Sequence, residues 1–212
     1  MQLIGMLDSP YVRRVAISLQ FLGLEFQHRS ISVFRQIEQF KQFNPVVKAP
    51  SLLCDDGTVL MDSTLILQYA EGLAAPGRSL MPADAGQAQR ALRAIGLALA
   101  ACEKSVQILY ERHLRPEDKQ HEPWVTRVTG QLLEAYRELE QELTRVPLQT
   151  QRGTINQPGI AAAVAWNFTQ AMLPQAVPAA QFPALQRHSA ASEQLAEFRL
   201  APHGMDIYPH RD

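Results

Sequence analysis

The chain has 212 residues, enough for one large domain or two smaller ones, because domains of about 100–150 residues are the commonest. With 46% hydrophobic and 19% charged residues, its composition excludes a disordered or low-complexity protein. The 20 basic and 21 acidic residues leave a formal net charge of −1, so no overall basic field attracts phosphate backbones and we expect no nucleic-acid partner.

The chain begins with a predicted strand, helix and second strand. Residues 1–6 are a short apolar run, followed by Asp8-Ser9-Pro10. Apolar residues then recur at helical spacing until Gly23, which predicts a helix. Residues 25–33 lack a clean alternation, but their length and position suit a strand parallel to the first. These elements predict a βαβ unit.

A short helix, a hairpin and a further helix complete this half. Residues 35–43 form a polar helical stretch. Residues 51–54 and 58–61 flank an Asp-Gly pair, which is a strong hairpin signal. Apolar residues share one face of residues 63–73, which predicts a helix. The order βαβαββα predicts an α/β thioredoxin-like N-terminal domain over residues 1–76.

The second half of the chain predicts helices alone. Residues 77–86 lie in a stretch rich in Ala, Pro and Gly without periodicity, and we expect them to link two domains. Residues 87–212 are predicted to form an all-α helical-bundle C-terminal domain. Its expected helices are 87–115, 124–146, a helix buried on every side at 160–173, and shorter ones at 182–185 and 192–198.

The sequence shows no pattern typical of export, membrane insertion or metal binding. The first ten residues lack the cationic start and long apolar stretch of a secretory signal, and no apolar run approaches the roughly 20 residues that span a bilayer. We therefore expect a cytoplasmic protein without a membrane partner. Cys54 and Cys102 are far apart and in no metal-ligand spacing, so we interpret both as reduced, buried core residues.

Ser9 and Pro10 stand at the predicted start of the first helix. Serine is a favoured N-cap and proline a favoured first helical residue, so capping alone accounts for both. The alternative is functional, because free N–H groups and partial positive charge at a helix N-terminus favour an anion such as a thiolate. A hydroxyl there can donate to the sulfur and help to lower a thiol pKa from about 8.5. The local pattern leaves both interpretations open.

Residues 44–52, NPVVKAPSL, place a proline at the entrance to a predicted strand. Because proline removes a hydrogen-bond donor from the ladder, we expect Pro50 at a turn or edge, with a cis Ala49–Pro50 bond as one option. Such a bend exposes the backbone of Ala49, which could then pair with a peptide ligand. Lys48 is either a cation for that ligand or a solvated loop residue.

Asp62 and Ser63 precede the last predicted helix of this half. Ser63 can cap that helix, and its hydroxyl together with the free helical N–H groups could instead bind a carboxylate. Asp62 could accept a hydrogen bond from an ammonium group. The pair could therefore recognise both charges of an amino acid.

Together and in order, the segments SPYVRRV, NPVVKAPSL and DSTLILQYAE resemble the N-terminal domain of glutathione S-transferases, especially serine-type bacterial and plant tau-like members. The linker, the helical half and the late FPALQRH segment also resemble this family, so the resemblance covers nearly the whole chain. It implies an enzyme that binds glutathione as the thiolate and adds it to a small electrophilic, hydrophobic substrate. It also implies a homodimer, with glutathione as co-substrate and no metal.

The resemblance assigns three parts of a glutathione site to the first two segments. Ser9 would be the catalytic residue and hydrogen-bond the glutathione sulfur. Ala49 would pair its backbone with the cysteinyl moiety beside cis-Pro50. Lys48 would meet the glycyl end.

The resemblance also implies the rest of the site. Asp62 and Ser63 would hold the γ-glutamyl end of glutathione. Looser candidates for the pocket of the second, hydrophobic substrate are Tyr11, Tyr110, His113 and Trp166, although we expect Trp166 to pack in the core.

Three positions depart from the family pattern. Ala49 stands where valine is usual, which keeps the backbone contact but shrinks the wall beside it. Asp62 stands where glutamate is commoner, so its reach is shorter. The buried helix of the second half usually starts with a Ser or Thr cap and an Asp three residues later, whereas here Asn156 can cap but Gly159 cannot reciprocate.

Three other functions remain open. An isomerase that uses glutathione as a true cofactor cannot be separated from a conjugating enzyme by sequence. A glutathione-dependent thiol–disulfide reductase would need a cysteine at the helix start, where this chain has Ser9, and Cys54 lies in a predicted strand. A transferase-like module that binds partners without turnover is disfavoured by the intact site residues.

Overall fold

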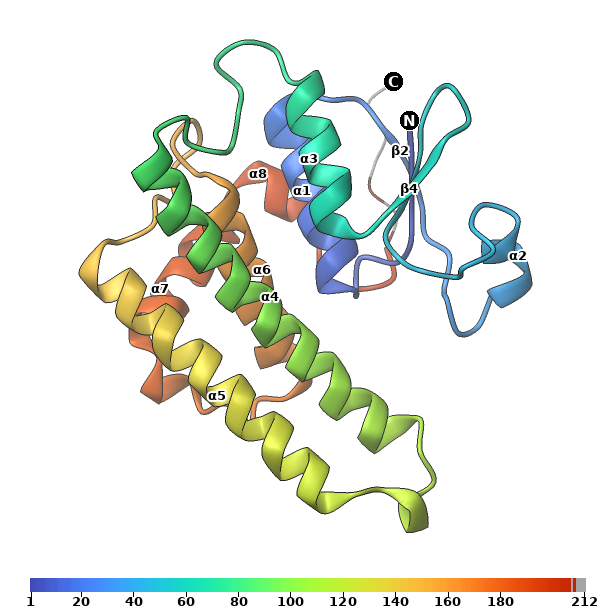
Figure 1. The fold of residues 1–212 in the computed structure, drawn as a ribbon, viewed down its shortest axis with the longest axis vertical. Helices are drawn as coiled ribbons and strands as arrows, with labels where there is room; N and C mark the ends of the chain where they lie inside the picture. The colour runs from blue at the N-terminus through green and yellow to red at the C-terminus, as the bar shows by residue number, and fades with distance from the viewer. Residues whose placement is uncertain (207, 209–212) are drawn as a thin grey trace. The chain divides into compact units, whose positions relative to one another are not determined.

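The computed structural model describes residues 1–206 and Tyr208. The chain forms two compact units, one of Met1–Met81 together with the described residues from Gln194 onward, and one of Pro82–Glu193 (Figure 1). The division differs from the sequence-based one at the C-terminus, because residues 194–206 and Tyr208 belong to the first unit.

The first unit is a four-stranded sheet with helices on both sides (Figure 1). The strands lie in the order β2-β1-β3-β4, with β1 parallel to β2 and antiparallel to β3, and β3 and β4 form the predicted hairpin. The elements are β1 (Gln2–Ile4), α1 (Pro10–Leu22), β2 (Gln27–Arg29), α2 (Ile37–Lys41), β3 (Ser51–Leu53), β4 (Val59–Met61) and α3 (Ser63–Leu73). The predicted thioredoxin-like order βαβαββα is therefore confirmed.

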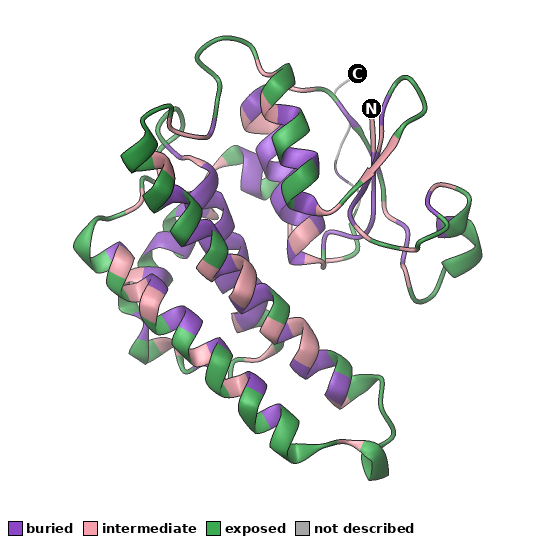
Figure 2. Ribbon diagram, viewed as in Figure 1, coloured by how far each residue is buried: buried purple, intermediate pink, exposed green. Residues whose placement is uncertain are grey.

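Helix α1 begins and ends at the signals that the sequence carries. Its N-cap is Ser9, its first residue is Pro10, and Gly23 ends it in the left-handed conformation with φ 75°. The helix is buried over most of its length (Figure 2). On the other side of the sheet, Phe40 of α2 packs against Ile4. The sheet is therefore covered on both faces, as expected for an α/β fold.

The second unit is all helical. Its helices are α4 (Ala85–His113), α5 (Glu122–Arg145), α6 (Gln157–Met172) and α7 (Pro183–Ser192), with short 3₁₀ turns at Glu117–Lys119 and Ala179–Gln181. As predicted, α6 is buried on nearly every side, and Trp166 is a core residue that meets Tyr136 edge to face, with 5.3 Å between ring centroids. The two last predicted helices differ from those observed, because α7 continues to Ser192 and α8 (Ala196–Arg199) follows separately within the first unit.

The start of α6 explains one departure from the family pattern. Asn156 caps the helix by accepting a hydrogen bond from Gly159 N at 3.3 Å. A Cβ atom at Gly159 would lie 3.2 Å from the Ile155 side chain and 3.3 Å from the Gln149 carbonyl oxygen. The space that an aspartate would need at Gly159 is therefore occupied by the preceding loop.

Both cysteines are buried and unbridged, as predicted. Among the described residues, no helix is long and apolar enough to cross a membrane.

Candidate functional site

The register of the sheet brings the three sequence motifs to the same end of the first unit. Ile4 of β1 pairs with Ser51 of β3, and Ser51 pairs with Met61 of β4. β1 runs into the Ser9 turn, β3 comes directly from the Ala49–Pro50 bond, and β4 runs directly into Asp62. Because neighbouring strands are about 4.8 Å apart, the motifs that flank this row lie close together.

Ser9 combines a weak cap with a hydroxyl that can act on a ligand. Its Oγ accepts a hydrogen bond from Val12 N at 3.4 Å, which is long for an N–H···O bond. Its backbone N–H donates to the Met6 carbonyl at 3.1 Å, which fixes the turn before α1. A hydroxyl that accepts from the helix still has its own proton to donate. Capping and sulfur binding are therefore compatible roles for Ser9.

Asp8 brings an ionisable group next to Ser9. Desolvation raises the pKa of Asp8, and the charges of His203 and Arg35 oppose that rise. Sequence reasoning did not single out these three residues, because they lie far apart in the chain and in no recognisable motif.

The loop before β3 contains the cis Ala49–Pro50 peptide bond that the sequence suggested. Ser51 Oγ donates to the Lys48 carbonyl at 2.7 Å and accepts from the buried Asn44 amide at 2.8 Å. Pro50 is buried, Ala49 is half-buried and Lys48 is exposed. Asn44 therefore stabilises the segment that presents Ala49 and Lys48. This role is visible only in the folded structure.

Gly5 allows the start of α1 and this loop to approach each other. Its φ is +135°, which side-chain-bearing residues rarely adopt. A Cβ atom here would lie 2.6 Å from Val12 Cγ2 and 3.0 Å from Ala49 Cβ. The sequence shows only a glycine within the apolar run of residues 1–6, so the importance of Gly5 was missed.

Asp62, not Ser63, is the N-cap of α3. Its carboxylate accepts from Thr64 N at 2.8 Å, and its φ of 72° is unusual for a non-glycine residue. Backbone strain of this kind is found preferentially at functional sites. Ser63 is the first helical residue and is buried, so its hydroxyl is free of the capping role that the sequence suggested.

Arg14 connects α1 to the start of α3. It is only 3% exposed, and its Nη1 donates to Ser63 Oγ at 3.1 Å and to Thr64 Oγ1 at 3.3 Å. A guanidinium is thus held where the free N–H groups of α3 already favour an anion. The sequence signal, an arginine within an apolar helical pattern, does not reveal which residues it contacts.

The residues suggested for the second substrate do not all belong to one unit. Tyr11 is half-buried on α1 of the first unit, whereas Tyr110 and His113 are exposed on the last turn of α4 in the second unit. Their grouping into one pocket stays a prediction.

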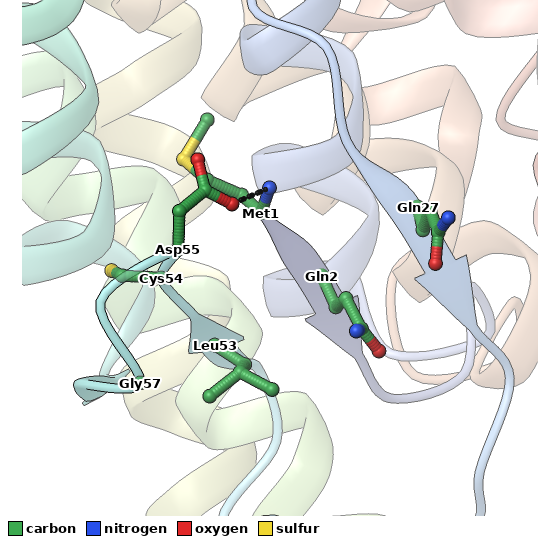
Figure 3. A pocket seen from close by; sticks show the side chains of 7 residues that line it. All are labelled: Met1, Gln2, Gln27, Leu53, Cys54, Asp55 and Gly57. Atoms are coloured by element: carbon green, nitrogen blue, oxygen red, sulfur yellow. Dashed lines mark hydrogen bonds and ion pairs between the residues drawn. The ribbon is translucent and has the colours of Figure 1, made fainter.

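A separate open cavity of about 410 Å³ lies at the opposite end of the sheet (Figure 3). Its lining includes Gln2 and Leu53, which pair at the start of β1 and the end of β3. The Met1 ammonium group lies 2.7 Å from the Asp55 carboxylate in the same place. Cys54 also lines the cavity, but burial raises the pKa of its thiol and makes the reactive thiolate scarce. Because it lies at the start of β1 and the end of β3, this cavity is remote from the Ser9 motif.

Sequence comparison links this chain to one family. A family profile described as glutathione S-transferase, N-terminal domain, matches residues 3–78. The uncharacterized GST-like protein YibF of Escherichia coli is 28% identical over 165 residues, which cover 78% of this chain and 80% of YibF.

Solved structures give the same result for the fold. A glutathione S-transferase of Methylobacterium radiotolerans, in complex with glutathione sulfonate, is 25% identical with a TM-score of 0.84, over 100% of this chain and 95% of that one. A glutathione transferase family member of Pseudomonas fluorescens, with bound S-(propanoic acid)-glutathione, is 26% identical with a TM-score of 0.79, over 95% of this chain and 98% of that one. With the thioredoxin-like sheet, the cis-proline loop and the helical second unit, these matches show that residues 3–78 resemble a glutathione S-transferase N-terminal domain and that the whole chain is similar in fold to members of that family.

Proposed function

We propose that this protein is a glutathione transferase, which binds glutathione as the thiolate and adds it to a small, hydrophobic electrophile. The observation that carries the proposal is the row Ile4, Ser51, Met61, which collects the three motifs at one end of the sheet. Two of the similar proteins were solved with glutathione derivatives, which supports glutathione as the co-substrate.

The γ-glutamyl end of glutathione fits the start of α3. The Ser63 hydroxyl, the free N–H groups of the helix and the nearby Arg14 guanidinium favour its carboxylate. The Asp62 carboxylate supplies a negative charge for its ammonium group, and one oxygen remains when the other caps α3.

The middle and the glycyl end of glutathione fit the loop before β3. The half-buried backbone of Ala49, beside cis-Pro50, is suited to pair with the cysteinyl residue. The exposed Lys48 ammonium group suits the glycyl carboxylate. The cysteinyl sulfur then points to Ser9.

The chemical step needs only a thiolate held near an electrophile. The thiol proton passes to water, and the Ser9 hydroxyl and the N-terminal amides of α1 stabilise the negative sulfur. A sulfur lone pair forms the S–C bond, while the electron pair of the broken bond leaves with the leaving group or moves to an adjacent electron-withdrawing atom, which is then protonated by water. Positioning of the two reactants supplies the remaining rate enhancement.

Ser9→Ala tests this proposal. We expect the variant to bind glutathione, to have a higher pKa for the bound thiol and to conjugate aryl halides about tenfold to a hundredfold more slowly at neutral pH, because one hydrogen bond to the charged sulfur is lost. Calorimetry with glutathione and a panel of aryl halides, isothiocyanates, peroxides and disulfides would measure these effects. A variant that keeps full activity and is merely less stable would show that Ser9 only caps α1. A wild-type protein that binds no glutathione would favour the partner-binding module.

The same panel separates conjugation from reduction, and an isomerase would be inactive on all four classes of compound. An isomerase would turn over only a substrate whose product retains no glutathione, and a reductase would consume disulfides. Ser9 occupies the position where a reductase needs a cysteine, and the raised thiol pKa of Cys54 makes it a poor substitute. These observations favour conjugation over disulfide reduction.

A homodimer and a cytoplasmic location belong to the proposal. Large apolar side chains are exposed at the end of β4 and along one face of α3, namely those of Met61, Leu65, Tyr69 and Leu73. Such a patch marks an interaction surface, and a second copy of the chain is its expected partner. Light scattering after size-exclusion chromatography should give twice the monomer mass, and Leu65→Lys should give the monomer. The cytosol suits a protein with free cysteines and a glutathione co-substrate.

A further inference from the structure

The C-terminal segment, defined as residues 196–206 together with Tyr208, packs within the first unit along α1 and β2. It begins as α8, beside α1 (Figure 1). Gln20 Nε2 donates to the Glu197 carbonyl at 2.9 Å. Phe21 and Phe198 meet edge to face, with 6.5 Å between ring centroids. The segment is therefore anchored to the C-terminal end of α1, three turns from Ser9.

The next contact lies one turn from Ser9. Arg13 is 2% exposed, its Nε donates to the Ala201 carbonyl at 2.7 Å, and its guanidinium carbon lies 5.7 Å from the centre of the Phe198 ring. The Arg13 backbone N–H donates to the Ser9 carbonyl at 3.0 Å. Arg13 thus contacts Ser9 through its backbone and the C-terminal segment through its side chain.

Beyond Ala201 the segment reaches the turn that precedes α1. His203 and Arg35 both interact electrostatically with Asp8. Arg35 also donates to Met205 Sδ at 3.0 Å and to Met6 Sδ at 3.7 Å. Arg35 therefore links Met6 of the turn to Met205 of the C-terminal segment, while Asp8 itself stays exposed.

The end of the described segment is fixed to β2. Tyr208 N donates to His28 Nδ1 at 3.0 Å, and its ring stacks on Phe26 with 4.7 Å between centroids. Because His28 Nδ1 accepts this bond, we assign the imidazole proton to Nε2, which donates to the Gly5 carbonyl at 2.7 Å. The segment is thus linked through His28 to Gly5, the residue at which the start of α1 and the cis-proline loop approach each other.

We infer that the C-terminal segment is a positioning element of the glutathione site: it holds the turn from Met6 to Ser9 in place, and His203 offsets the negative charge of Asp8 beside the sulfur position. This inference rests on the proposed function for its effect on glutathione. The positioning of the turn by the C-terminal segment does not depend on any ligand. His203 is a positioning residue, since it acts on the sulfur through Asp8 and the turn.

The first experiment measures amide hydrogen exchange in the ligand-free protein. His203→Gln should accelerate exchange of the Ser9 and Val12 amides severalfold, because the turn opens more often when the electrostatic interaction between His203 and Asp8 is lost. Gln20→Ala is the matched control, since it cuts the hydrogen bond to Glu197 at the far end of the same segment and should leave these two amides unchanged. Equal exchange in His203→Gln and wild type would overturn the positioning role.

The second experiment titrates the thiol of bound glutathione by its ultraviolet thiolate absorbance. In His203→Gln the thiol pKa should rise by about half a unit, because a nearby carboxylate loses its compensating charge. Adding Asp8→Asn to the same chain should restore the wild-type pKa, which a merely structural defect would not allow. A rise that Asp8→Asn fails to reverse would overturn the charge compensation. If the wild type binds no glutathione, the proposed function fails, while the exchange comparison still decides the positioning role.

Discussion

The two units bury polar side chains for different purposes. In the first unit each strand has only three residues, so loops and helix starts supply much of the structure, and buried Arg14 and Asn44 tie those loops together. In the second unit Tyr136 links helices within the core, where its hydroxyl donates to the Ala165 carbonyl at 2.9 Å and accepts from Thr169 Oγ1 at 2.6 Å. Polar contacts of the first unit shape the proposed glutathione site, and those of the second stabilise a bundle.

The helix starts show the same difference. Asp62 caps α3 with one oxygen at a position suited to bind a ligand. In the second unit both carboxylate oxygens of Glu140 are used to cap α7, since they accept from Ala184 N at 2.7 Å and from Leu185 N at 2.9 Å. We therefore expect substitutions of these first-unit residues to alter glutathione binding, and substitutions in the core of the second unit to alter stability without altering glutathione binding.

Gly5→Ala is expected to have the largest effect. The added Cβ would overlap Val12, and alanine would have to adopt φ +135°, so roughly 3 kcal/mol or more of stability should be lost from overpacking and backbone strain. Denaturant unfolding measures the loss. Gly72→Ala is the control, because a Cβ there meets nothing within 4 Å and alanine favours a helix by about 0.5–1 kcal/mol. Similar stabilities for the two variants would contradict the close approach at Gly5.

Arg14→Leu should weaken glutathione binding without changing the thiol pKa. The substitution removes the donor that orients Ser63, so the KM for glutathione should rise about tenfold, the effect of one hydrogen bond of a charged donor. Arg14→Lys should recover part of the affinity, because one ammonium group can reach one of the two hydroxyls. Steady-state kinetics would measure KM and kcat, and the thiol titration would measure the pKa of the bound thiol. A lower kcat with an unchanged KM would place Arg14 in the chemical step instead.

The sequence predicted the local features of the first unit well. The start of α1, the hairpin, the start of α3 and the cis Ala49–Pro50 bond each depend on neighbouring residues, so their signals are visible in the chain. The contact between Arg14 and Ser63 joins residues 49 apart in sequence and follows only from the packing of α1 on α3. The role of Gly5 likewise depends on what approaches it from two directions.

The C-terminal residues were predicted least well. Helical periodicity after Phe182 indicated two short helices but not where the chain leaves the bundle. The helix α7 ends at Ser192, and the following residues return to α1 through contacts such as Arg13 to Ala201. No local signal marks that return, because its hydrogen bonds go largely to backbone carbonyls, which every residue carries.

Tyr136→Phe should separate stability from binding in the second unit. The lost hydroxyl makes two buried hydrogen bonds, and Thr169 keeps its contact with Ser105 at 2.8 Å, so we expect a loss of about 1–2 kcal/mol in the free energy of unfolding. Glutathione affinity, measured by calorimetry, should not change. Tyr110→Phe, at a residue that is 45% exposed, should leave stability within about 0.5 kcal/mol of wild type. Impaired glutathione binding in Tyr136→Phe would break the proposed division of labour between the units.

The smallest effect concerns the pH dependence of stability in the second unit. Burial lowers the pKa of His188 below its ordinary value of 6.5, while its hydrogen bond to the Gly159 carbonyl opposes the shift. Between the two values the unfolded chain binds the proton and the folded chain does not, so protonation favours unfolding. The contribution of His188 is therefore fully present above about pH 6.5 and is lost as the pH falls towards the lowered value. Unfolding measured from pH 7.5 to 5 should show a steeper loss of stability in wild type than in His188→Gln, and parallel curves would show that His188 titrates alike in both states.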